Sequence, residues 1–385
     1  MQGVIDQFAQ AVRAAADAGR VLRLRGGGSK DFYGQSLEGE VLDTHAYAGI
    51  VEYDPTELVV TVRCGTPLTE LEAALAAKQQ MLACECPHFG PVPSPPAPLP
   101  ISGEGSLVTA APTRGMATLG GAVAAGLSGP RRQAAGSVRD FILGAKLMDG
   151  RGEVLNFGGR VMKNVAGYDV SRVLAGSLGT LGLILEVSLK TLPVPVATAT
   201  LSFELPEDRV IHTLNQWGGK PLPVSASAWG GGALCLRLSG AAAAVRAACE
   251  TLGGERMSDD QAAAYWQGVR EQTDAFFGSS DAPLWPLWRL SLPSTTPPLQ
   301  LPGEQLIEWG GALRWLKTGA DAATIRTAAA KAGGHATLFR GSDELKAVAG
   351  VFQPLPAAMM KIHRGLKAQF DPAGIFNRGR MYPEF

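Results

Sequence analysis

The stretch 22-LRLRGGGSK-30 places three successive glycines, a hydroxyl and a cation directly after an alternating, strand-like run. Glycine tolerates backbone conformations with φ > 0 and lets another molecule approach the main chain closely. Successive exposed N–H groups in such a turn form a concave site for an anion, so one interpretation of this loop is phosphate binding. The other interpretation is a flexible hairpin loop, and these residues alone favour neither.

Cysteine is the second residue type whose spacing could support chemistry. The chain has five cysteines, and an odd number in a chain of this length argues against a disulfide framework. Cys84 and Cys86 form a C-x-C pair, which supplies at most half of a metal site, whereas an iron–sulfur cluster needs four ligands at set spacing. We therefore predict reduced thiols and no bound metal.

The composition indicates a globular protein with room for two domains. The chain has 385 residues, of which 46% are hydrophobic and 18% charged. Lys and Arg together number 35, as do Asp and Glu, so the net charge is zero and a basic nucleic-acid-binding surface is not expected. The N-terminal stretch lacks the pattern of a signal peptide, and no apolar run is long enough to span a membrane. These features predict a cytoplasmic protein.

The elements that must position the glycine loop follow from the hydrophobic periodicity. Thr66 is predicted to cap a helix over 65–80, with Pro67 at its first helical position. The other expected elements of the first part are a helix over 3–18, strands over 20–25, 40–43, 48–53 and 57–63, a small-residue segment over 117–129, strands over 141–149 and 153–157, and an apolar strand before residue 193.

The pattern of predicted strands and helices changes after residue 194. Strands alternate with predicted helices over 206–215, 241–252, 259–273 and 321–332, which indicates an α+β domain with an antiparallel sheet. We therefore predict a first domain over 1–194 and a cap domain over 195–354. A helix and tail over 355–385 are expected to pack back on the first domain.

Seven motifs in a fixed order are more specific than any of them alone. They are R-G-G-G-S-K, G-T-P-L, A-T-L-G-G-A-V-A-A-G, S-V-R-D-F-I-L-G, K-N-V-A-G-Y-D, G-S-L-G-T-L-G and F-D-P-A-G-I-F-N-R-G-R. This set resembles the FAD-linked oxidases of the vanillyl-alcohol-oxidase/PCMH type. Within that family it is similar, over nearly the whole chain, to the FAD-binding E-type subunits of bacterial glycolate oxidases.

The resemblance implies an α+β fold with a PCMH-type FAD-binding domain of two subdomains, followed by the cap domain. It implies that the glycine loop wraps the FAD pyrophosphate, while Thr118 and its small neighbours line the flavin. FAD is expected to be non-covalent, because the loop carries no histidine for a covalent link. The predicted cofactor-binding residues are Arg25, Gly26, Gly27, Gly28, Ser29, Lys30, Gly65, Thr118, Gly120, Gly121, Ser137, Arg139, Asp140, Ile184, Glu186 and Asn377.

A proline-rich insertion over 91–117 departs from the family pattern, with six prolines between 91 and 100. Its position before the flavin-lining segment would let it shield the flavin or contact a partner. The alternative, which we favour, is a tolerated surface insertion, since lengthening a loop costs little.

The resemblance also implies a function within a complex. The chain would be the FAD-binding subunit of a glycolate oxidase (glycolate dehydrogenase), which oxidises 2-hydroxy acids to 2-oxo acids beside a catalytic D-type flavoprotein subunit and an iron–sulfur subunit. Contact with a membrane would come only through these partners. Two alternatives stay open: a self-sufficient FAD-dependent 2-hydroxy-acid dehydrogenase, and a non-catalytic scaffold.

Oxidation of a 2-hydroxy acid needs a cation for the carboxylate and a base for the hydroxyl proton. The candidates are the bases His335 and His363 and the cations Arg314, Arg340 and Arg380. Catalytic relatives carry a G-D-G-N-x-H-like stretch that this sequence lacks, so no catalytic residue is assigned. His335 is interpreted as a structural histidine, and His363 is placed on a solvated or interface face of its helix.

Overall fold

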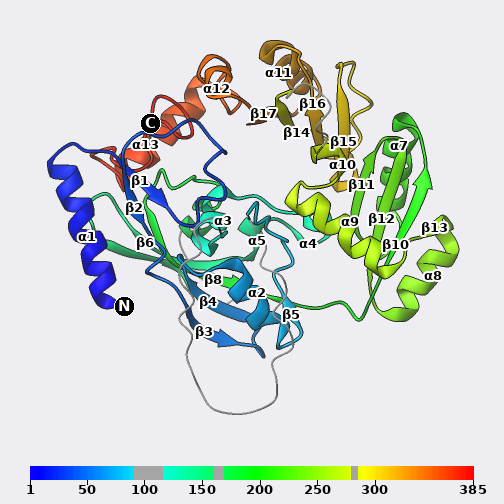
Figure 1. Ribbon diagram of the computed structural model, residues 1–385, viewed down its shortest axis with the longest axis horizontal. Coiled ribbons are helices and arrows are strands. Elements are labelled where there is room, and N and C mark those ends of the chain that lie inside the picture. The colour runs from blue at the N-terminus through cyan, green and yellow to red at the C-terminus, as the bar shows by residue number, and fades with distance from the viewer. Residues whose placement is uncertain (91–115, 160–168, 279–284) are drawn as a thin grey trace.

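The computed structural model describes residues 1–90, 116–159, 169–278 and 285–385, and two blocks built on separate sheets lie side by side in it (Figure 1). The first block contains α1 (Gln2–Asp17), β1 (Leu22–Arg25), β2 (Glu40–Asp43), β3 (Ile50–Asp54), β4 (Val59–Arg63), α2 (Leu68–Ala76), β5 (Gln80–Met81), α3 (Leu119–Ala125), α4 (Arg132–Ala135), α5 (Val138–Phe141), β6 (Ile142–Met148), β7 (Val154–Gly158), α6 (Val170–Val173), β8 (Leu183–Lys190) and β9 (Leu192–Pro193).

The second block contains β10 (Ala197–Glu204), α7 (Glu207–Gly218), β11 (Val224–Gly230), β12 (Ala233–Gly240), α8 (Ala242–Leu252), β13 (Glu255–Arg256), α9 (Asp259–Glu271), α10 (Ala275–Gly278), β14 (Leu287–Ser291), β15 (Glu304–Glu308), η1 (Trp309–Gly311), β16 (Leu313–Lys317), α11 (Ala322–Lys331), β17 (His335–Arg340) and α12 (Asp343–Ala349). The last helix, α13 (Ala357–Phe370), returns to the first block (Figure 1).

The first block is organised by a five-stranded antiparallel sheet in the order β3-β4-β8-β6-β7. Helix α2 covers this core with leucines 68, 71 and 75, which recur at helical spacing and are fully buried. The predicted cap of this helix is wrong, because Pro67 occupies the N-cap position. The Thr66 hydroxyl accepts instead from the Gly49 N–H at 2.8 Å and fixes the entry into β3.

The second block carries an eight-stranded antiparallel sheet in the order β13-β10-β12-β11-β15-β16-β14-β17, which confirms the predicted α+β class. Because side chains alternate along a strand, the sheet has two different faces. Trp288 and Leu290 of β14 pack under α11 with Ile325. Trp315 and Phe339 lie on the other face, in one apolar cluster with residues of the first block.

Polar contacts also join the two blocks. The Trp309 indole donates to the Gly129 carbonyl at 3.1 Å, and Glu85 forms an ion pair with Arg237 at 2.8 Å. The eight-stranded sheet of the second block, called the cap sheet from here on, is therefore held against the first block by apolar and polar contacts.

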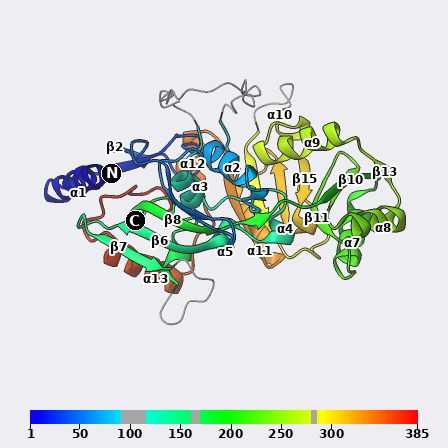
Figure 2. The ribbon, with the colours of Figure 1, turned by 90° about the horizontal axis from the view of Figure 1, so that it is seen from below.

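Backbone hydrogen bonds join the C-terminal segment to β1, near the start of the chain. The Leu22 N–H donates to Ile375 and the Asn377 N–H donates to Leu22, so residues 375–377 run parallel to β1. Figure 2 shows α13 beside β6 and β7 on the outside of the first block. Phe370 at the end of α13 packs edge-on against Phe157 of β7.

Two sequence expectations concern residues that the structure does not describe. The proline-rich insertion falls outside the described residues over 91–115, and so do residues 163–168 of the K-N-V-A-G-Y-D motif. Asp169, the last residue of that motif, caps α6 through the Arg172 N–H. In the described part of the chain, no helix is long and apolar enough to cross a membrane.

Candidate functional site

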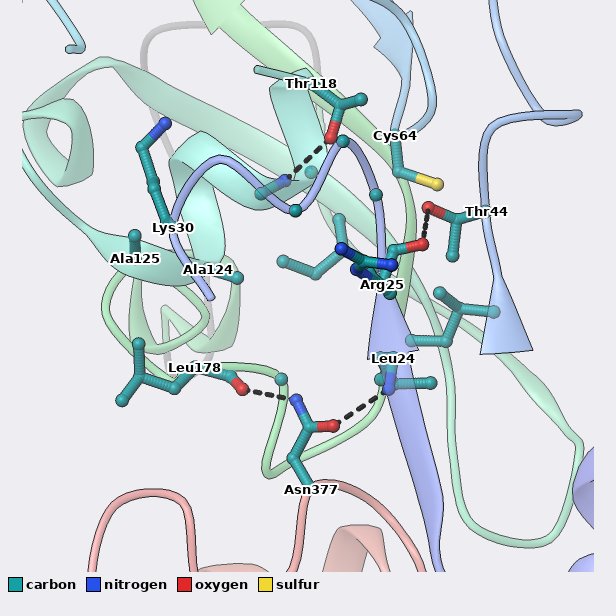
Figure 3. Close-up of a pocket in the computed structure, with 18 of the residues that line it drawn as sticks. Leu24, Arg25, Lys30, Thr44, Cys64, Thr118, Ala124, Ala125, Leu178 and Asn377 are labelled. Atoms are coloured by element: carbon teal, nitrogen blue, oxygen red, sulfur yellow. Dashed lines mark hydrogen bonds between the residues drawn. The ribbon is translucent and has the colours of Figure 1, made fainter. Parts of the chain in front are cut away.

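A cavity opens where the end of β1, the start of α3 and the C-terminal segment meet (Figure 3). About 740 Å³ of empty space lies in it, part of which is open to solvent. Its lining residues are Leu24, Arg25, Gly26, Gly27, Gly28, Ser29, Lys30, Asp31, Thr44, Cys64, Thr118, Gly120, Gly121, Ala124, Ala125, Leu178, Gly179, Gly182, Leu183, Ile184, Asn377 and Arg380. The structure thus brings together eleven of the predicted cofactor-binding residues and one catalytic candidate, Arg380.

The glycine loop forms one wall of the cavity with its backbone donors unused. The N–H groups of residues 26–30 donate to no acceptor among the described residues. Gly28 has a positive φ of 73°, and a Cβ on Gly27 would overlap the carbonyl oxygen of Met116. Side chains are therefore excluded from the loop, and unsatisfied backbone donors of this kind call for an acceptor.

A second wall, adjacent to the loop, is the helix α3, whose first turn is built from small residues. Thr118 caps the helix and its hydroxyl accepts from the Gly121 N–H at 3.3 Å (Figure 3). A Cβ on Gly120 would lie 2.7 Å from the Cβ of Cys64, so glycine lets the helix approach β4. Ala124 and Ala125 leave the cavity side of the next turn open.

Asn377 ties three segments together at the edge of the cavity. Its amide oxygen accepts from the Leu24 N–H at 2.8 Å, and its amide nitrogen donates to the Leu178 carbonyl at 2.6 Å (Figure 3). Gly179 must stay a glycine, since a Cβ there would lie 2.7 Å from this amide nitrogen. Both polar atoms of the Asn377 amide are thus used to hold these segments together at the edge of the cavity.

Two buried cations, Lys30 and Arg380, flank the loop, and the structure shows no ion pair of either with a described residue. Burial lowers the pKa of Lys30 to about 8, and its Nζ lies 3.3 Å from the His88 carbonyl oxygen. Arg380 donates to the carbonyls of Lys30 and Tyr33 at 3.0 and 2.8 Å, but its buried Nε finds no partner. Burial lowers its pKa to about 10.

These groups fit a cofactor that carries a diphosphate. Five consecutive N–H groups and two cations without a carboxylate partner are the donor set that two phosphate charges need. The walls beyond the loop are apolar or small, which suits a flat ring system.

Five of the predicted cofactor-binding residues do not line the cavity. Gly65 packs behind it and donates to the Tyr47 carbonyl at 2.9 Å. Ser137 and Asp140 form a capping box at the start of α5, and Arg139 is exposed beside them.

Glu186 shares β8 with the lining residue Ile184 but lies further along the strand. Its carboxylate accepts from the Tyr47 hydroxyl at 2.5 Å and pairs with Lys146 at 2.9 Å. The structure therefore gives Glu186 a role within the sheet.

The remaining catalytic candidates lie outside the cavity. Arg314 is fully buried in the second block, where it donates to the Thr296 and Pro297 carbonyls. Arg340 stacks on Phe32, with its guanidinium 4.0 Å from the ring centre, and burial lowers its pKa to about 10.

Both histidine interpretations need correction. His335 is exposed at the start of β17, and its ring has no hydrogen bond to any residue that the structure describes, so it is not a satisfied core histidine. His363 is half-buried on α13, with its ring 6.4 Å from that of Tyr382 and 6.2 Å from that of Phe385. It therefore anchors the tail rather than facing solvent.

The five cysteines are all unpaired. Cys84 and Cys86 are buried with their sulfurs 3.5 Å apart. Across the described ranges, no cluster of three or more His, Cys, Asp or Glu side chains is arranged to hold a metal ion.

Sequence reasoning missed two polar residues of the cap sheet. Arg289 lies on the face turned toward the first block, with its guanidinium 5.3 Å from the centre of the Trp309 ring. Glu308 lines the same small hollow between the blocks as Arg289, and its carboxylate accepts from the Trp315 indole at 2.7 Å. The alternation of apolar and polar residues along β14 and β15 is the signal that would have placed them on this face.

Burial raises the pKa of Glu308 to about 8, from an ordinary value of 4.5. Between these values the folded protein binds a proton that the unfolded chain has lost, so Glu308 costs stability as the pH rises. We expect the stability advantage of Glu308→Gln over the wild type to grow by ~1.4 kcal/mol per pH unit between the two pKa values. Urea unfolding at a series of pH values measures this, and a difference that stays constant across the range would contradict it.

The fold and the cavity fit a class to which the comparisons with known proteins also point, the FAD-linked oxidoreductases. The FAD binding domain family (FAD_binding_4) matches residues 3–92 and 102–158. The solved structure of alkyldihydroxyacetonephosphate synthase superposes with a TM-score of 0.59 at 14% identity, covering 96% of this chain and 74% of that one, so the two share the fold.

A relative that aligns over the whole chain assigns it to one family within this class. Glycolate oxidase subunit GlcE of Escherichia coli (strain K12) is 45% identical over 383 residues, which cover 100% of this chain and 97% of that protein. The chain belongs to the GlcE family of FAD-binding oxidoreductase subunits. Glycolate oxidase subunit GlcD of Bacillus subtilis (strain 168) is 36% identical over 86 residues, or 22% of this chain and 18% of that protein.

Proposed function

We propose that the cavity holds FAD non-covalently, with its diphosphate against residues 26–30. The unused N–H groups of this loop are the single observation that carries the placement. Lys30 and Arg380 would add positive charge, Asn377 would keep the cavity closed, and Thr118 to Ala125 would lie along the ring system. Bound there, FAD supplies the acceptor for the hydride of an oxidised substrate.

We propose further that the chain serves as the FAD-binding subunit of a glycolate oxidase complex that converts glycolate and related 2-hydroxy acids to 2-oxo acids. The full-length likeness to a protein named glycolate oxidase subunit supports this assignment. Its partners would be a GlcD-type catalytic flavoprotein and an iron–sulfur subunit that takes the electrons. The complex would act in the cytoplasm, with any membrane contact made by a partner.

One observation favours a second candidate, a 2-hydroxy-acid site within this chain. Arg289 faces the first block, and its guanidinium forms no hydrogen bond or ion pair with the residues described. Such a cation could hold a substrate carboxylate. The scaffold alternative has less support, because the loop and the cavity beside it are intact.

An anaerobic titration of the purified chain with glycolate and with D-lactate separates these candidates through the visible absorbance of the flavin. We expect a flavin band that neither acid bleaches in the isolated chain and that glycolate bleaches once the partner subunits are added. Bleaching in the isolated chain, abolished by Arg289→Gln, would instead establish a site of its own. Absence of a flavin band would refute the placement of FAD.

A further inference from the structure

One carboxylate lies in the cavity proposed for two phosphate charges. Among the described residues that line this cavity, Asp31 alone carries an acidic side chain, and it directly follows the glycine loop. A negative charge there repels a bound diphosphate and by itself lowers the affinity for FAD. The contacts of Asp31 indicate what compensates for this repulsion.

Asp31 is held beside the loop by a turn and by two arginines of β1. Its N–H donates to the Gly28 carbonyl at 3.0 Å, which closes a turn over residues 28–31. Its carboxylate oxygen Oδ2 lies 2.8 Å from Nη2 of Arg23 and 2.8 Å from Nε of Arg25. Burial lowers the pKa of Arg380 to about 10, and the nearby charge of Asp31 opposes this shift. Three cations thus surround one carboxylate, so the net charge around Asp31 stays positive.

The side chain of Arg25 lines the cavity, whereas that of Arg23 does not (Figure 3). A Cβ on Gly28 would lie 2.6 Å from Nη2 of Arg25, so glycine at this position leaves room for the guanidinium. Asp31 contacts this guanidinium at Nε, and neither Nη group donates a hydrogen bond to a residue that the structure describes. The two Nη groups are therefore available to a ligand.

Contact with Arg25 at Nε favours the binding of an anion. A guanidinium binds a phosphate best through two parallel N–H···O bonds, and the two Nη groups stay open for them when Nε is the atom engaged. The Arg25 side chain is 44% exposed, so without a partner it would have many rotamers, and ordering them costs free energy on binding. Arg23 offsets the charge of Asp31 at the same oxygen. Asp31 can therefore orient Arg25 while adding little repulsion.

We propose that Asp31 is a positioning residue for the cofactor diphosphate: it holds Arg25 at Nε and leaves both Nη groups free to bind phosphate oxygens. The inference rests on the proposed function, because it assumes that the diphosphate lies against residues 26–30. It goes beyond that function by giving a role in cofactor binding to a residue whose own charge opposes the ligand.

A double-mutant cycle on Arg25 and Asp31 tests the proposal, with FAD and ADP titrated separately into the flavin-free chain. ADP carries the same diphosphate without the flavin. We expect Arg25→Gln to weaken the binding of both ligands at least about tenfold, and Asp31→Asn to weaken it about fivefold. In the Arg25→Gln background, Asp31→Asn should cause no further weakening, because no guanidinium is left to orient.

Arg23→Gln is the matched control. It removes an ion pair from the same oxygen of Asp31, but Arg23 does not line the cavity. The affinity for FAD should therefore change by less than about threefold. The thermal midpoints of all flavin-free variants show whether the chain still folds. Arg25→Lys keeps the charge but has no Nε for Asp31 to hold, so it should recover only a small part of the lost affinity.

Three results would overturn the inference. Unchanged or tighter FAD binding in Asp31→Asn would mean that the carboxylate does not assist the ligand. Equal weakening by Asp31→Asn with and without Arg25 would assign Asp31 to the structure of the loop. Wild-type affinity in Arg25→Gln would show that this guanidinium does not bind the diphosphate. Each of these leaves the proposed function intact, whereas a wild-type chain that binds neither FAD nor ADP would refute the proposed function itself.

Discussion

Replacing Gly27 by aspartate is expected to leave the purified chain with less than about a tenth of the wild-type flavin content. A Cβ at this position would overlap the Met116 carbonyl, so the loop must move. The new carboxylate also stands against two phosphate charges. A loss of ~1.4 kcal/mol in binding already gives a tenfold weaker complex, and this change combines two such effects. Flavin absorbance per mole of protein after gel filtration measures the outcome.

A second variant separates cofactor binding from folding. Ala124→Phe leaves the glycine loop untouched and fills the cavity side of α3, so it should also lose flavin. Circular dichroism and the thermal midpoint of the flavin-free chain should be close to wild type for this variant. Normal flavin content in both variants would show that the cofactor binds elsewhere.

The second large effect is expected at Asp371, which is 1% exposed. Its carboxylate pairs with the buried Lys367 at 2.7 Å and accepts from the Ile375 and Phe376 N–H groups. Asp371→Ala leaves a buried cation and two backbone donors without this partner. The free energy of unfolding should fall by about 3–5 kcal/mol, as when one member of a buried ion pair is removed. Urea unfolding of the flavin-free chain checks this value.

The cause of that loss can be isolated with two further variants. Asp371→Asn keeps an acceptor for the backbone but leaves Lys367 charged and unpaired. Combining it with Lys367→Met removes the charge, so the double variant should be more stable than Asp371→Asn alone. If the double variant is the less stable of the two, the buried charge does not explain the effect.

The sequence predicted the glycine wall of the cavity because its composition is tied to its backbone geometry. Three glycines before Ser29 and Lys30 have few structural uses, and the small residues of α3 are equally distinctive. The two-sheet α+β organisation was also predictable, since the change from the first to the second pattern of strands and helices is marked near residue 194.

Some predicted cofactor-binding residues do not line the cavity, because the sequence pattern that suggested them also occurs for a structural reason. Ser137 and Asp140 sit in a segment that runs near cofactors in the family, but S-x-x-D is also a helix-capping pattern, and capping is what the structure shows. Glu186 comes two residues after Ile184, which predicts the same face of β8, but the register of β8 against β6 shifts between them. Ile184 therefore pairs with Leu147 on the cavity side, whereas Glu186 pairs with Lys146 on the other face of the sheet.

The arginines of the cap sheet could not be sorted from the sequence into those that face the first block and those that do not. Arg314 and Trp315 are neighbours in sequence, but alternation puts them on opposite faces of the sheet. Trp315 faces the first block, so Arg314 cannot. Without knowing which face meets the first block, the sequence could not separate Arg314 from Arg289.

The parallel backbone pairing between β1 and residues 375–377 has a consequence for biosynthesis. Leu24 and Asn377, which close one side of the cavity together, are 353 residues apart. At ordinary translation rates of about 5–20 residues per second, the ribosome needs roughly 20–70 s to make the second after the first. The glycine loop is thus exposed to solvent throughout synthesis of the second block, and the cavity is complete only after that block has emerged. A nascent chain that stalls before residue 371 should have both sheets but be unable to retain FAD.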